Sequence, residues 1–181
     1  MRKTTAGLFI SLDGVTESPN EWQFDHFDEG MAAEMTAFER ETDTILLGRV
    51  TYEEWAPYWP TSTDEPFATF INETPKHVVS TTLEKPLEWS NSMLVEGNLA
   101  EEISELKQKP GKNIGVAGSP TLLRSLLLND LLDELTLMVH PVVVGSGKRL
   151  FDGGGDTKRL ELADSKTTRT GVSILTYRPK K

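Results

Sequence analysis

Cysteine is absent from this chain of 181 residues, and histidine occurs only at His26, His77 and His140. The lack of cysteine excludes disulfide bonds, thiolate catalysis, iron–sulfur clusters and cysteine-ligated zinc. The three histidines show no H-x-x-x-H spacing, so a histidine-rich metal site is not expected either. The sequence therefore predicts no metal site.

Long apolar runs are also missing, since none approaches the roughly 20 residues that a membrane-spanning helix needs. The N-terminal segment is basic and then apolar, as in a secretion signal, but its apolar part is only Ala6 to Leu12. Asp13 stands where a signal peptide would have a cleavage site of small residues. We interpret this segment as a first strand and expect a cytoplasmic protein.

Positive charge is in the minority, with 19 Lys and Arg against 28 Asp and Glu and a formal net charge of −9. Nucleic acids and anionic membranes require a broad basic face, so we expect neither as a partner. A small anionic ligand needs only a few local donors and stays compatible with this charge. The length and the hydrophobic fraction of 37% predict a single domain, residues 1–181.

Hydrophobic periodicity and capping residues predict strands and helices in alternation. We expect helices over 28–41, 51–55, 99–109 and 120–128, and strands over 5–12, 44–47, 77–80, 93–95, 113–117, 134–144, 159–164 and 172–178. Strands that alternate with helices form parallel sheets through right-handed crossovers, whereas the last strands have no helix between them. The expected fold is α/β, with a mixed, mostly parallel central sheet, helices on both faces and an antiparallel C-terminal strand pair.

Three expected strand ends carry glycine, hydroxyl or cationic residues. Gly48, Arg49 and Thr51 follow one strand, Ser80-Thr81-Thr82 follow the next, and Gly118-Ser119-Pro120 join a third strand to a helix. Ligands of open α/β sheets bind beyond the carboxyl ends of parallel strands. A helix N-terminus there favours an anion, although helix capping alone explains any single junction. Three such junctions on one rim predict an anion-binding site.

The common nucleotide-binding fingerprints are not found. G-x-G-x-x-G does not follow the first strand, and no G-x-x-x-x-G-K-[ST] occurs. Gly145-Ser146-Gly147-Lys148 ends in Gly-Lys, but Arg149 stands where Ser or Thr is required. The residues alone therefore predict an anion at this rim without naming it.

Five motifs, in order and over nearly the whole chain, carry a family resemblance. They are SLDG (11–14), LLGRVTYEEW (46–55), VVST (78–81), VAGSPTLL (116–123) and HPVVVGSGKRLF (140–151). Their sequence and spacing resemble the dihydrofolate reductase superfamily. Within it, the chain is most similar to stand-alone bacterial proteins that resemble the reductase domain of the bifunctional riboflavin-biosynthesis deaminase–reductase. The resemblance implies a dihydrofolate reductase-like fold, the cofactor NADPH and reduction of a small heterocycle of pyrimidine or pterin type.

The resemblance also implies which residues bind the cofactor. It assigns the NADPH phosphates to Gly48, Arg49 and Thr51, the adenosine 2′-phosphate region to Ser80 and Thr81, and the pyrophosphate to Ala117, Gly118, Ser119, Pro120, Thr121 and Leu122. Family members commonly pair, so a homodimer through the late antiparallel strands is expected.

The sequence departs from the family pattern at two places. Dihydrofolate reductases carry a carboxylic acid early in the first long helix, where this chain has Met31, with Asp28 and Glu29 nearby. Riboflavin-pathway reductases read Gly-small-Gly-Thr and then Asp-Pro, where this chain has Gly48-Arg49-Val50-Thr51 and then TYEEWAPYWP. The zinc ligands of the partner deaminase domain are not in the sequence. The natural substrate is therefore left open.

Asp13 is the candidate catalytic residue, because a carboxyl group at the end of the first strand could bind or protonate a substrate. An Asp-Gly turn explains it equally well. Trp55 and Tyr58 are candidate substrate-binding residues that could wall a pocket for a flat heterocycle, or else cover the edge of the core or a dimer contact. An alternative to the reductase is a non-catalytic nucleotide-binding protein that retains the fold.

Overall fold

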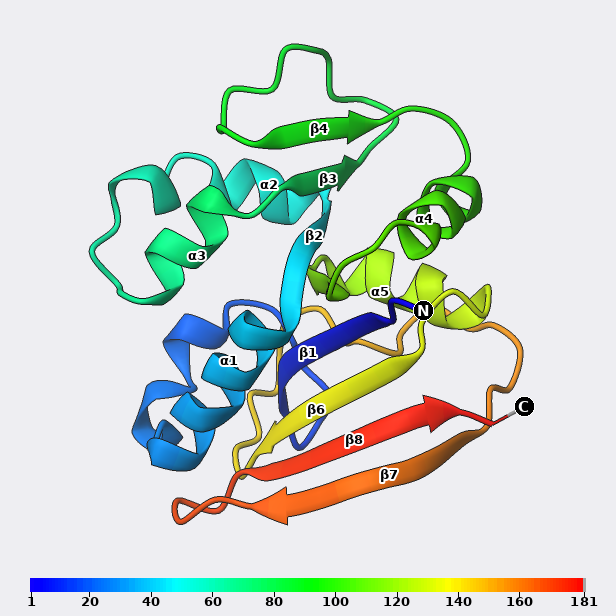
Figure 1. Ribbon diagram of the computed structural model, residues 1–181. Coiled ribbons are helices and arrows are strands. Elements are labelled where there is room, and N and C mark those ends of the chain that lie inside the picture. Colours follow the sequence, from blue (N-terminus) through cyan, green and yellow to red (C-terminus); the bar gives the residue numbers. More distant parts are fainter. Residues whose placement is uncertain (181) are drawn as a thin grey trace.

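One eight-stranded sheet runs through the computed structural model, which describes residues 1–180 (Figure 1). Its strand order is β4-β3-β2-β5-β1-β6-β8-β7. The strands are β1 (Thr4–Ser11), β2 (Thr42–Gly48), β3 (Lys76–Val79), β4 (Ser92–Val95), β5 (Asn113–Gly118), β6 (Glu134–His140), β7 (Leu160–Thr167) and β8 (Ser173–Pro179). The helices are α1 (Glu29–Glu41), α2 (Arg49–Trp55), α3 (Phe67–Glu73), α4 (Leu99–Gln108) and α5 (Pro120–Leu128).

The sheet is parallel except at its C-terminal edge. Each pairing among β1 to β6 is parallel, whereas β8 lies antiparallel to both β6 and β7. The predicted mixed sheet with an antiparallel closing pair is therefore confirmed. Since parallel strands share a direction, β1, β2, β3 and β5 end at the same rim of the sheet.

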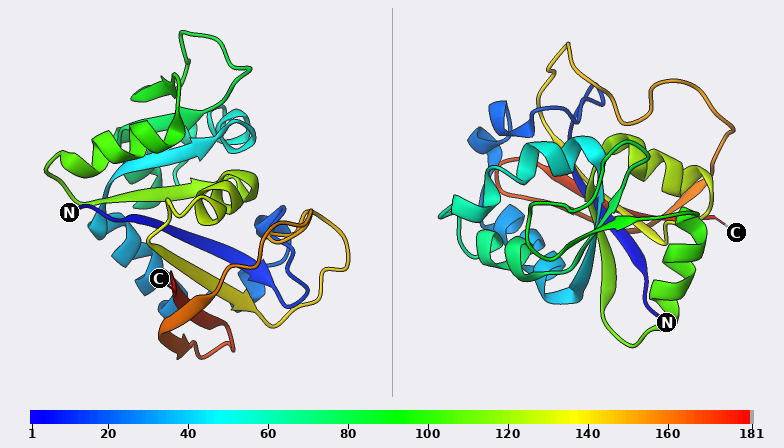
Figure 2. Two further views of the ribbon diagram at one scale, coloured as in Figure 1. Left: turned by 90° about the vertical axis from the view of Figure 1, so that its right-hand side faces the viewer. Right: turned by 90° about the horizontal axis from the view of Figure 1, so that it is seen from above.

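Helices cover the two faces of the sheet, as predicted, with α1, α2 and α3 on one side and α4 and α5 on the other (Figures 1 and 2). Successive side chains of β2 point to opposite faces of the sheet, so this strand packs against the helices on both sides. Leu46 packs in the cluster with Leu123 of α5, whereas Ile45 and Leu47 pack in a second cluster with Tyr52 of α2. Both faces of the central strands are therefore apolar, which is typical of a parallel sheet.

The predicted helix caps are confirmed. Asp28 accepts hydrogen bonds from the backbone N–H groups of Gly30 and Met31 at the start of α1, and Asn98 accepts one from Ala100 at the start of α4. Such side chains satisfy backbone donors that the first helical turn leaves unpaired. Local chemistry therefore sets where these helices begin.

Two elements differ from the prediction. β6 ends at His140 rather than at residue 144, because Pro141 has no N–H to donate to a sheet ladder. The helix α3 was not predicted; its seven residues bury only Ala68 and Ile71, which is too short a stripe to give a clear helical period.

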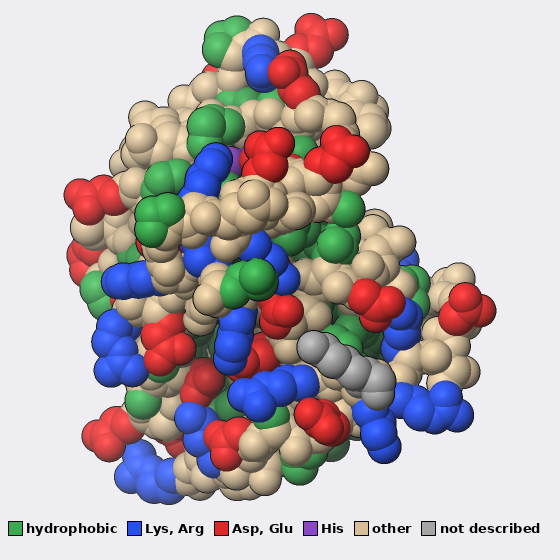
Figure 3. Space-filling view, turned by 45° about the vertical axis from the view of Figure 1, so that its right-hand side comes forward, with side chains coloured by type: hydrophobic (Ala, Val, Ile, Leu, Met, Phe, Trp, Pro, Cys, Tyr) green, Lys and Arg blue, Asp and Glu red, His purple; other side chains and the backbone are tan. Residues whose placement is uncertain are grey.

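The surface carries mixed charge. On the face in Figure 3, Lys and Arg side chains lie among Asp and Glu side chains rather than in one basic patch. Within residues 1–180, every helix falls short of the length and apolarity that spanning a bilayer requires. The same residues contain no group of three or more His, Asp and Glu side chains placed to share a metal ion.

Candidate active site

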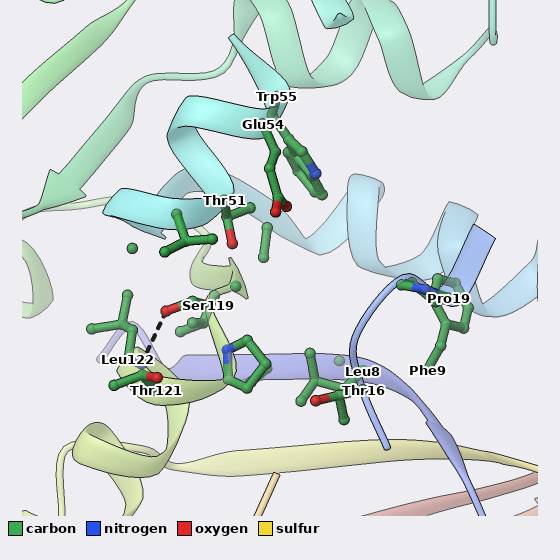
Figure 4. A pocket seen from close by; sticks show the side chains of 18 of the residues that line it. Leu8, Phe9, Thr16, Pro19, Thr51, Glu54, Trp55, Ser119, Thr121 and Leu122 are labelled. Carbon is green, nitrogen blue, oxygen red and sulfur yellow. Dashed lines mark hydrogen bonds between the residues drawn. The ribbon is translucent and has the colours of Figure 1, made fainter. Parts of the chain in front are cut away.

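A large cavity opens at the rim where the parallel strands end. Its volume is about 1670 Å³, and it continues along the face of the sheet toward α1. It is lined by every predicted cofactor-binding residue and by both predicted substrate-binding residues: Gly48, Arg49, Thr51, Ser80, Thr81, Ala117, Gly118, Ser119, Pro120, Thr121, Leu122, Trp55 and Tyr58. Figure 4 shows the centre of this cavity, with side chains converging from α2, α5 and the segment after β1.

The two glycine junctions of the rim pack directly against each other. A Cβ atom built on Gly48 would lie 2.5 Å from the Ser119 Oγ and 3.0 Å from the Ser119 backbone nitrogen. A Cβ on Gly118, whose φ is +137°, would lie 2.6 Å from the Thr51 Oγ1. Only glycine avoids these collisions. The start of α2 and the start of α5 therefore form one continuous surface.

Ser119 caps α5 and faces the cavity. Its Oγ accepts a hydrogen bond of 3.3 Å from the Leu122 N–H, drawn as the dashed line in Figure 4. Pro120 occupies the first helical turn, where a missing N–H costs nothing. Thr121 and Leu122 continue the lining. This helix end presents its backbone donors and its dipole to the cavity, an arrangement that favours an anionic group.

The turn after β3 places hydroxyl groups on the same cavity. The Ser80 Oγ accepts hydrogen bonds from the N–H groups of Thr82 (3.1 Å) and Leu83 (3.0 Å). Both bonds use the oxygen as acceptor, and the Thr82 Oγ1 lies 3.5 Å from it, so the hydroxyl proton of Ser80 can go to Thr82 or to a ligand. Thr81 and Thr82 also line this part of the cavity.

Arg49 supplies a cation at the first turn of α2. Its Nη1 donates to the Glu53 carboxylate at 2.6 Å, one helical turn further on. The side chain is 45% exposed, and the guanidinium has five N–H donors, so most stay available for an incoming phosphate.

Trp55 and Tyr58 belong to an aromatic wall. Trp55 stacks edge-on with Trp59 at 5.7 Å between ring centroids, and Trp59 with Phe67 at 4.9 Å. The Tyr58 hydroxyl donates to the Asp64 carboxylate at 2.5 Å. Trp55 therefore covers the edge of the core cluster and lines the cavity at once, so the two interpretations of this residue are compatible.

Asp13 is the exception among the predicted residues, because it does not line the cavity. Its carboxylate accepts hydrogen bonds from the Ser11 hydroxyl (2.7 Å) and from the N–H groups of Val144 (3.1 Å) and Gly145 (2.9 Å). Hydrogen bonds from Ser11, Gly145 and Val144 hold the pKa of Asp13 far below its usual range. Because these donors already occupy the carboxylate and it lies outside the cavity lining, the geometry favours the turn interpretation.

The family model of the RibD C-terminal domain matches residues 2–174 of the sequence. The chain belongs to this family. The Bacillus subtilis protein YyaP is 30% identical over 183 residues, which cover 97% of this chain and 94% of YyaP. The predicted kinship with the riboflavin-pathway reductase domain is therefore confirmed.

Solved structures show the same fold as this RibD C-terminal domain. A Shewanella sp. PV-4 protein, provisionally assigned to riboflavin biosynthesis, superimposes with a TM-score of 0.78 at 22% identity and 99% coverage of both chains. A Thermotoga maritima diaminohydroxyphosphoribosylaminopyrimidine deaminase/5-amino-6-(5-phosphoribosylamino)uracil reductase gives a TM-score of 0.69 at 14% identity, covering 99% of this chain and 57% of that one. At these identities the likeness shows the fold.

Helix α1 of this RibD C-terminal domain offers no free carboxyl group to the cavity. Met31 is fully buried in a core cluster. Burial raises the pKa of Asp28, but hydrogen bonds from Thr170 and Met31 outweigh it and lower the pKa to about 2. Glu29 does not line the cavity, and Glu34, which does, pairs with Lys166 at 2.5 Å. The structure therefore agrees with the sequence: the early part of α1 lacks the free carboxylic acid that dihydrofolate reductases carry in their first long helix.

Several lining residues were missed by the sequence interpretation. Glu54 of α2 is one; the others include Leu8, Phe9, Thr16, Pro19, Gln23, Met35, Phe38, Arg124 and Arg149. The segment after β1 and the inner side of α1 contribute most of them. A signal existed for Glu54, because it lies three residues after Thr51 and so on the same face of α2.

Proposed function

We propose that this protein is an NADPH-dependent reductase of a small heterocyclic substrate of pyrimidine or pterin type. The observation that carries the proposal is the packing of Gly48 against Ser119 and of Thr51 against Gly118 at the rim of one cavity. Arg49, Ser80 and Ser119 line one part of this cavity, and Trp55 and Tyr58 line another, so a dinucleotide and a substrate ring would have separate places in it.

The donor set around the rim fits NADPH. When bound, NADPH supplies a hydride from its nicotinamide C4. The α5 N-terminus with Ser119 and Thr121 would hold the pyrophosphate, and Arg49 with Ser80 would bind the 2′-phosphate. None of these residues is acidic. An acidic residue at this place would bind the ribose 2′-hydroxyl of NADH and would repel the 2′-phosphate of NADPH.

The rest of the cavity would hold the substrate ring. Trp55 offers an aromatic face, and the aromatic wall behind it would exclude water from the reacting atoms. The protein's contribution is then placement and orientation of two flat rings. No carboxyl group of α1 is free to protonate the product, so we assign the proton to solvent water.

The named activity of the Thermotoga relative supports a pyrimidine as the substrate class, since that protein is called a uracil reductase.

We propose further that the protein acts as a cytoplasmic homodimer. Seven of the eight residues of the edge strand β7 are exposed, with Leu162 at 54%. An exposed edge strand is a common pairing surface. Sedimentation velocity would test this by giving twice the chain mass, and a monomer at micromolar concentration would contradict it.

The test of the reductase proposal is titration of the purified protein with NADPH and with NADH, by tryptophan fluorescence and calorimetry. We expect micromolar NADPH binding that is at least about tenfold tighter than NADH binding. Oxidation of bound NADPH is then followed with pyrimidines and pterins. Absence of binding for both nucleotides would overturn the proposal. NADPH binding without turnover of either class would favour the alternative, a non-catalytic nucleotide-binding protein.

A further inference from the structure

One side of the cavity is formed by the segment that joins β1 to α1, residues 16–27, several of which line it. Hydrogen bonds hold the two ends of this β1–α1 segment. The Thr16 N–H donates to the Lys148 carbonyl oxygen (3.0 Å) at one end, and the Thr170 hydroxyl donates to the His26 carbonyl oxygen (2.6 Å) at the other. In between, within the described residues 1–180, the hydrogen bonds of residues 18–25 all stay inside the segment. The middle of the segment is therefore held in place by side-chain packing.

This packing centres on His140, the last residue of β6, whose side chain is fully buried. Trp22 stacks edge-on against the His140 ring at 5.3 Å between ring centroids, and His26 does so at 6.2 Å. Phe9 of β1 stacks against the same ring at 5.8 Å and also lines the cavity. Figure 4 shows Phe9 and Pro19 of the segment on the same side of the cavity. The His140 ring thus connects the β1–α1 segment to the sheet.

The His140 ring packs in its neutral form. Its Nδ1 lies 2.8 Å from the Met138 carbonyl oxygen, which can only accept, so Nδ1 carries the proton. Its Nε2 is buried and has no hydrogen-bond partner among residues 1–180. Burial lowers the pKa of His140 and the charge of His26 lowers it further, which together outweigh the opposite effect of the Met138 and Ile10 carbonyl oxygens.

The surroundings of His140 offer no negative charge to a protonated ring. Among residues 1–180, His26 of the β1–α1 segment is the titratable group whose charge acts on it, while β1 and β6 present the Phe9 ring and backbone carbonyl oxygens. Two further polar atoms of the segment, the Nδ1 of His26 and the Oε1 of Gln23, are buried without a hydrogen bond from another described residue. Unsatisfied buried polar groups destabilise the arrangement that buries them.

We propose that His140 is a positioning residue for the cavity: its neutral ring holds the β1–α1 segment in place, and protonation of the ring releases that segment. A charged imidazole here would carry a second N–H without an acceptor, next to another histidine instead of a carboxylate. Movement of Trp22 and His26 away from the ring lets water reach Nε2. The cavity is then complete near neutral pH and opens on this side in acid. This inference goes beyond the proposed function and holds for any ligand of the cavity.

Linkage gives the sign and the range of the pH dependence. The packed form binds fewer protons than the open form, because burial lowers the pKa of His140 only while the segment covers it. Below the ordinary histidine pKa of about 6.5, each pH unit therefore favours the open form about tenfold, until the pKa of the packed form is reached. Above about pH 6.5 the position of the segment should not depend on the charge of His140.

Hydrogen exchange of the whole protein, followed by mass spectrometry at pH 7, 6 and 5, tests the inference. No ligand is present, so the result is independent of the proposed function. We expect the protection of residues 16–27 to fall about tenfold or more from pH 7 to pH 5, while residues 113–128 of β5 and α5 keep theirs. Wild type and variants are compared at the same pH, where the intrinsic exchange rates of the 16–27 peptide are identical because the substitutions lie outside it.

His140→Asn and His140→Phe both remove the titrating group. Asn keeps an N–H donor for the Met138 carbonyl oxygen, whereas Phe keeps a flat ring for Trp22. Native circular dichroism is checked first, and either variant suffices. In each, the protection of residues 16–27 should be the same at pH 7 and pH 5.

His77→Asn is the matched control. His77 is also buried, and burial also lowers its pKa, but it lies on β3 and outside the cavity lining. This variant should keep the pH response of the wild type. Constant protection of the wild-type segment from pH 7 to pH 5 would overturn the inference. So would an equal fall in the His140 variants, or a wild-type fall that extends equally to residues 113–128.

Discussion

Gly118 lies so close to Thr51 that a Cβ atom on the glycine would sit 2.6 Å from the threonine Oγ1. The two residues are separated by 67 positions in the chain and join the ends of neighbouring strands, β5 and β2. Their contact brings the start of α5 to the start of α2. The candidate cofactor rim therefore depends on one glycine that both adopts a positive φ and tolerates a neighbour at this distance.

Replacing Gly118 by Ala should destabilise the protein by about 2 kcal/mol or more, because φ is positive and the methyl group collides with a buried side chain. Urea denaturation measures this, and NADPH affinity should fall with it. Gly154→Ala is the control: its φ is +76°, but no atom lies within 4 Å of the added carbon. Equal losses in the two variants would mean that the contact with Thr51 is unimportant.

Arg49→Ala should weaken NADPH binding about tenfold and NADH binding by less than about twofold, because only NADPH carries the 2′-phosphate that we assign to Arg49. Calorimetric titration of both nucleotides measures the ratio. Arg40→Ala serves as control, since Arg40 is an exposed cation of α1 outside the cavity lining. Equal losses for both nucleotides would leave Arg49 as a general phosphate contact and refute the 2′-phosphate assignment.

Asp13→Asn should lower the melting temperature by a few degrees and leave NADPH affinity and turnover within about twofold. The reason is that the carboxylate accepts hydrogen bonds from the N–H groups of Val144 and Gly145 and does not line the cavity. A proton donor, in contrast, typically contributes 10²–10⁴-fold to the rate. Differential scanning calorimetry and NADPH oxidation give the two readouts, with the exposed Asp156→Asn as reference. A hundredfold loss of activity at unchanged stability would restore Asp13 as catalytic.

Lys76 is fully buried, and its Nζ donates to the carbonyl oxygens of Ile71 (2.8 Å), Asn72 (3.2 Å) and Thr74 (3.0 Å) at the end of α3. Burial lowers the pKa of Lys76 to about 8. Between pH 8 and the ordinary lysine pKa of about 10.4, the unfolded chain binds more protons, so the free energy of unfolding rises with pH.

The matching experiment follows urea unfolding of the wild type and of Lys76→Met from pH 7 to pH 10. The stability of the wild type relative to the variant should increase above pH 8 by up to about 3 kcal/mol. Below pH 8 the lysine is protonated in both states, so the difference should be flat there. A difference that falls as the pH rises would mean that the three carbonyl acceptors outweigh the cost of burial.

The elements of this protein were predictable where their cause is local. Asp28, Asn98 and Ser119 each cap a helix through N–H groups two or three residues away, and such short-range bonds are visible as spacing in the sequence. The same holds for the Gly48 and Gly118 junctions, because a glycine between an apolar run and a helix marks a turn. The family resemblance then named the ligand that the residues alone described as an anion.

The partners of charged side chains were decided by the tertiary structure. In the sequence, the Asp13-Gly14 pair fits either a turn or a catalytic acid. In the fold, residues 141–149 lie against the end of β1, where Val144 and Gly145 donate N–H bonds to the Asp13 carboxylate and Arg149 donates to its carbonyl oxygen. Glu54 is one of two adjacent glutamates in α2; Glu53 pairs with Arg49, while Glu54 lines the cavity and has no ion-pair partner among residues 1–180. Sequence determined the strands, the caps and the rim, because those depend on neighbours along the chain. The fold decided which carboxylates are free, because ion pairs and hydrogen bonds form between groups that only folding brings within a few ångströms.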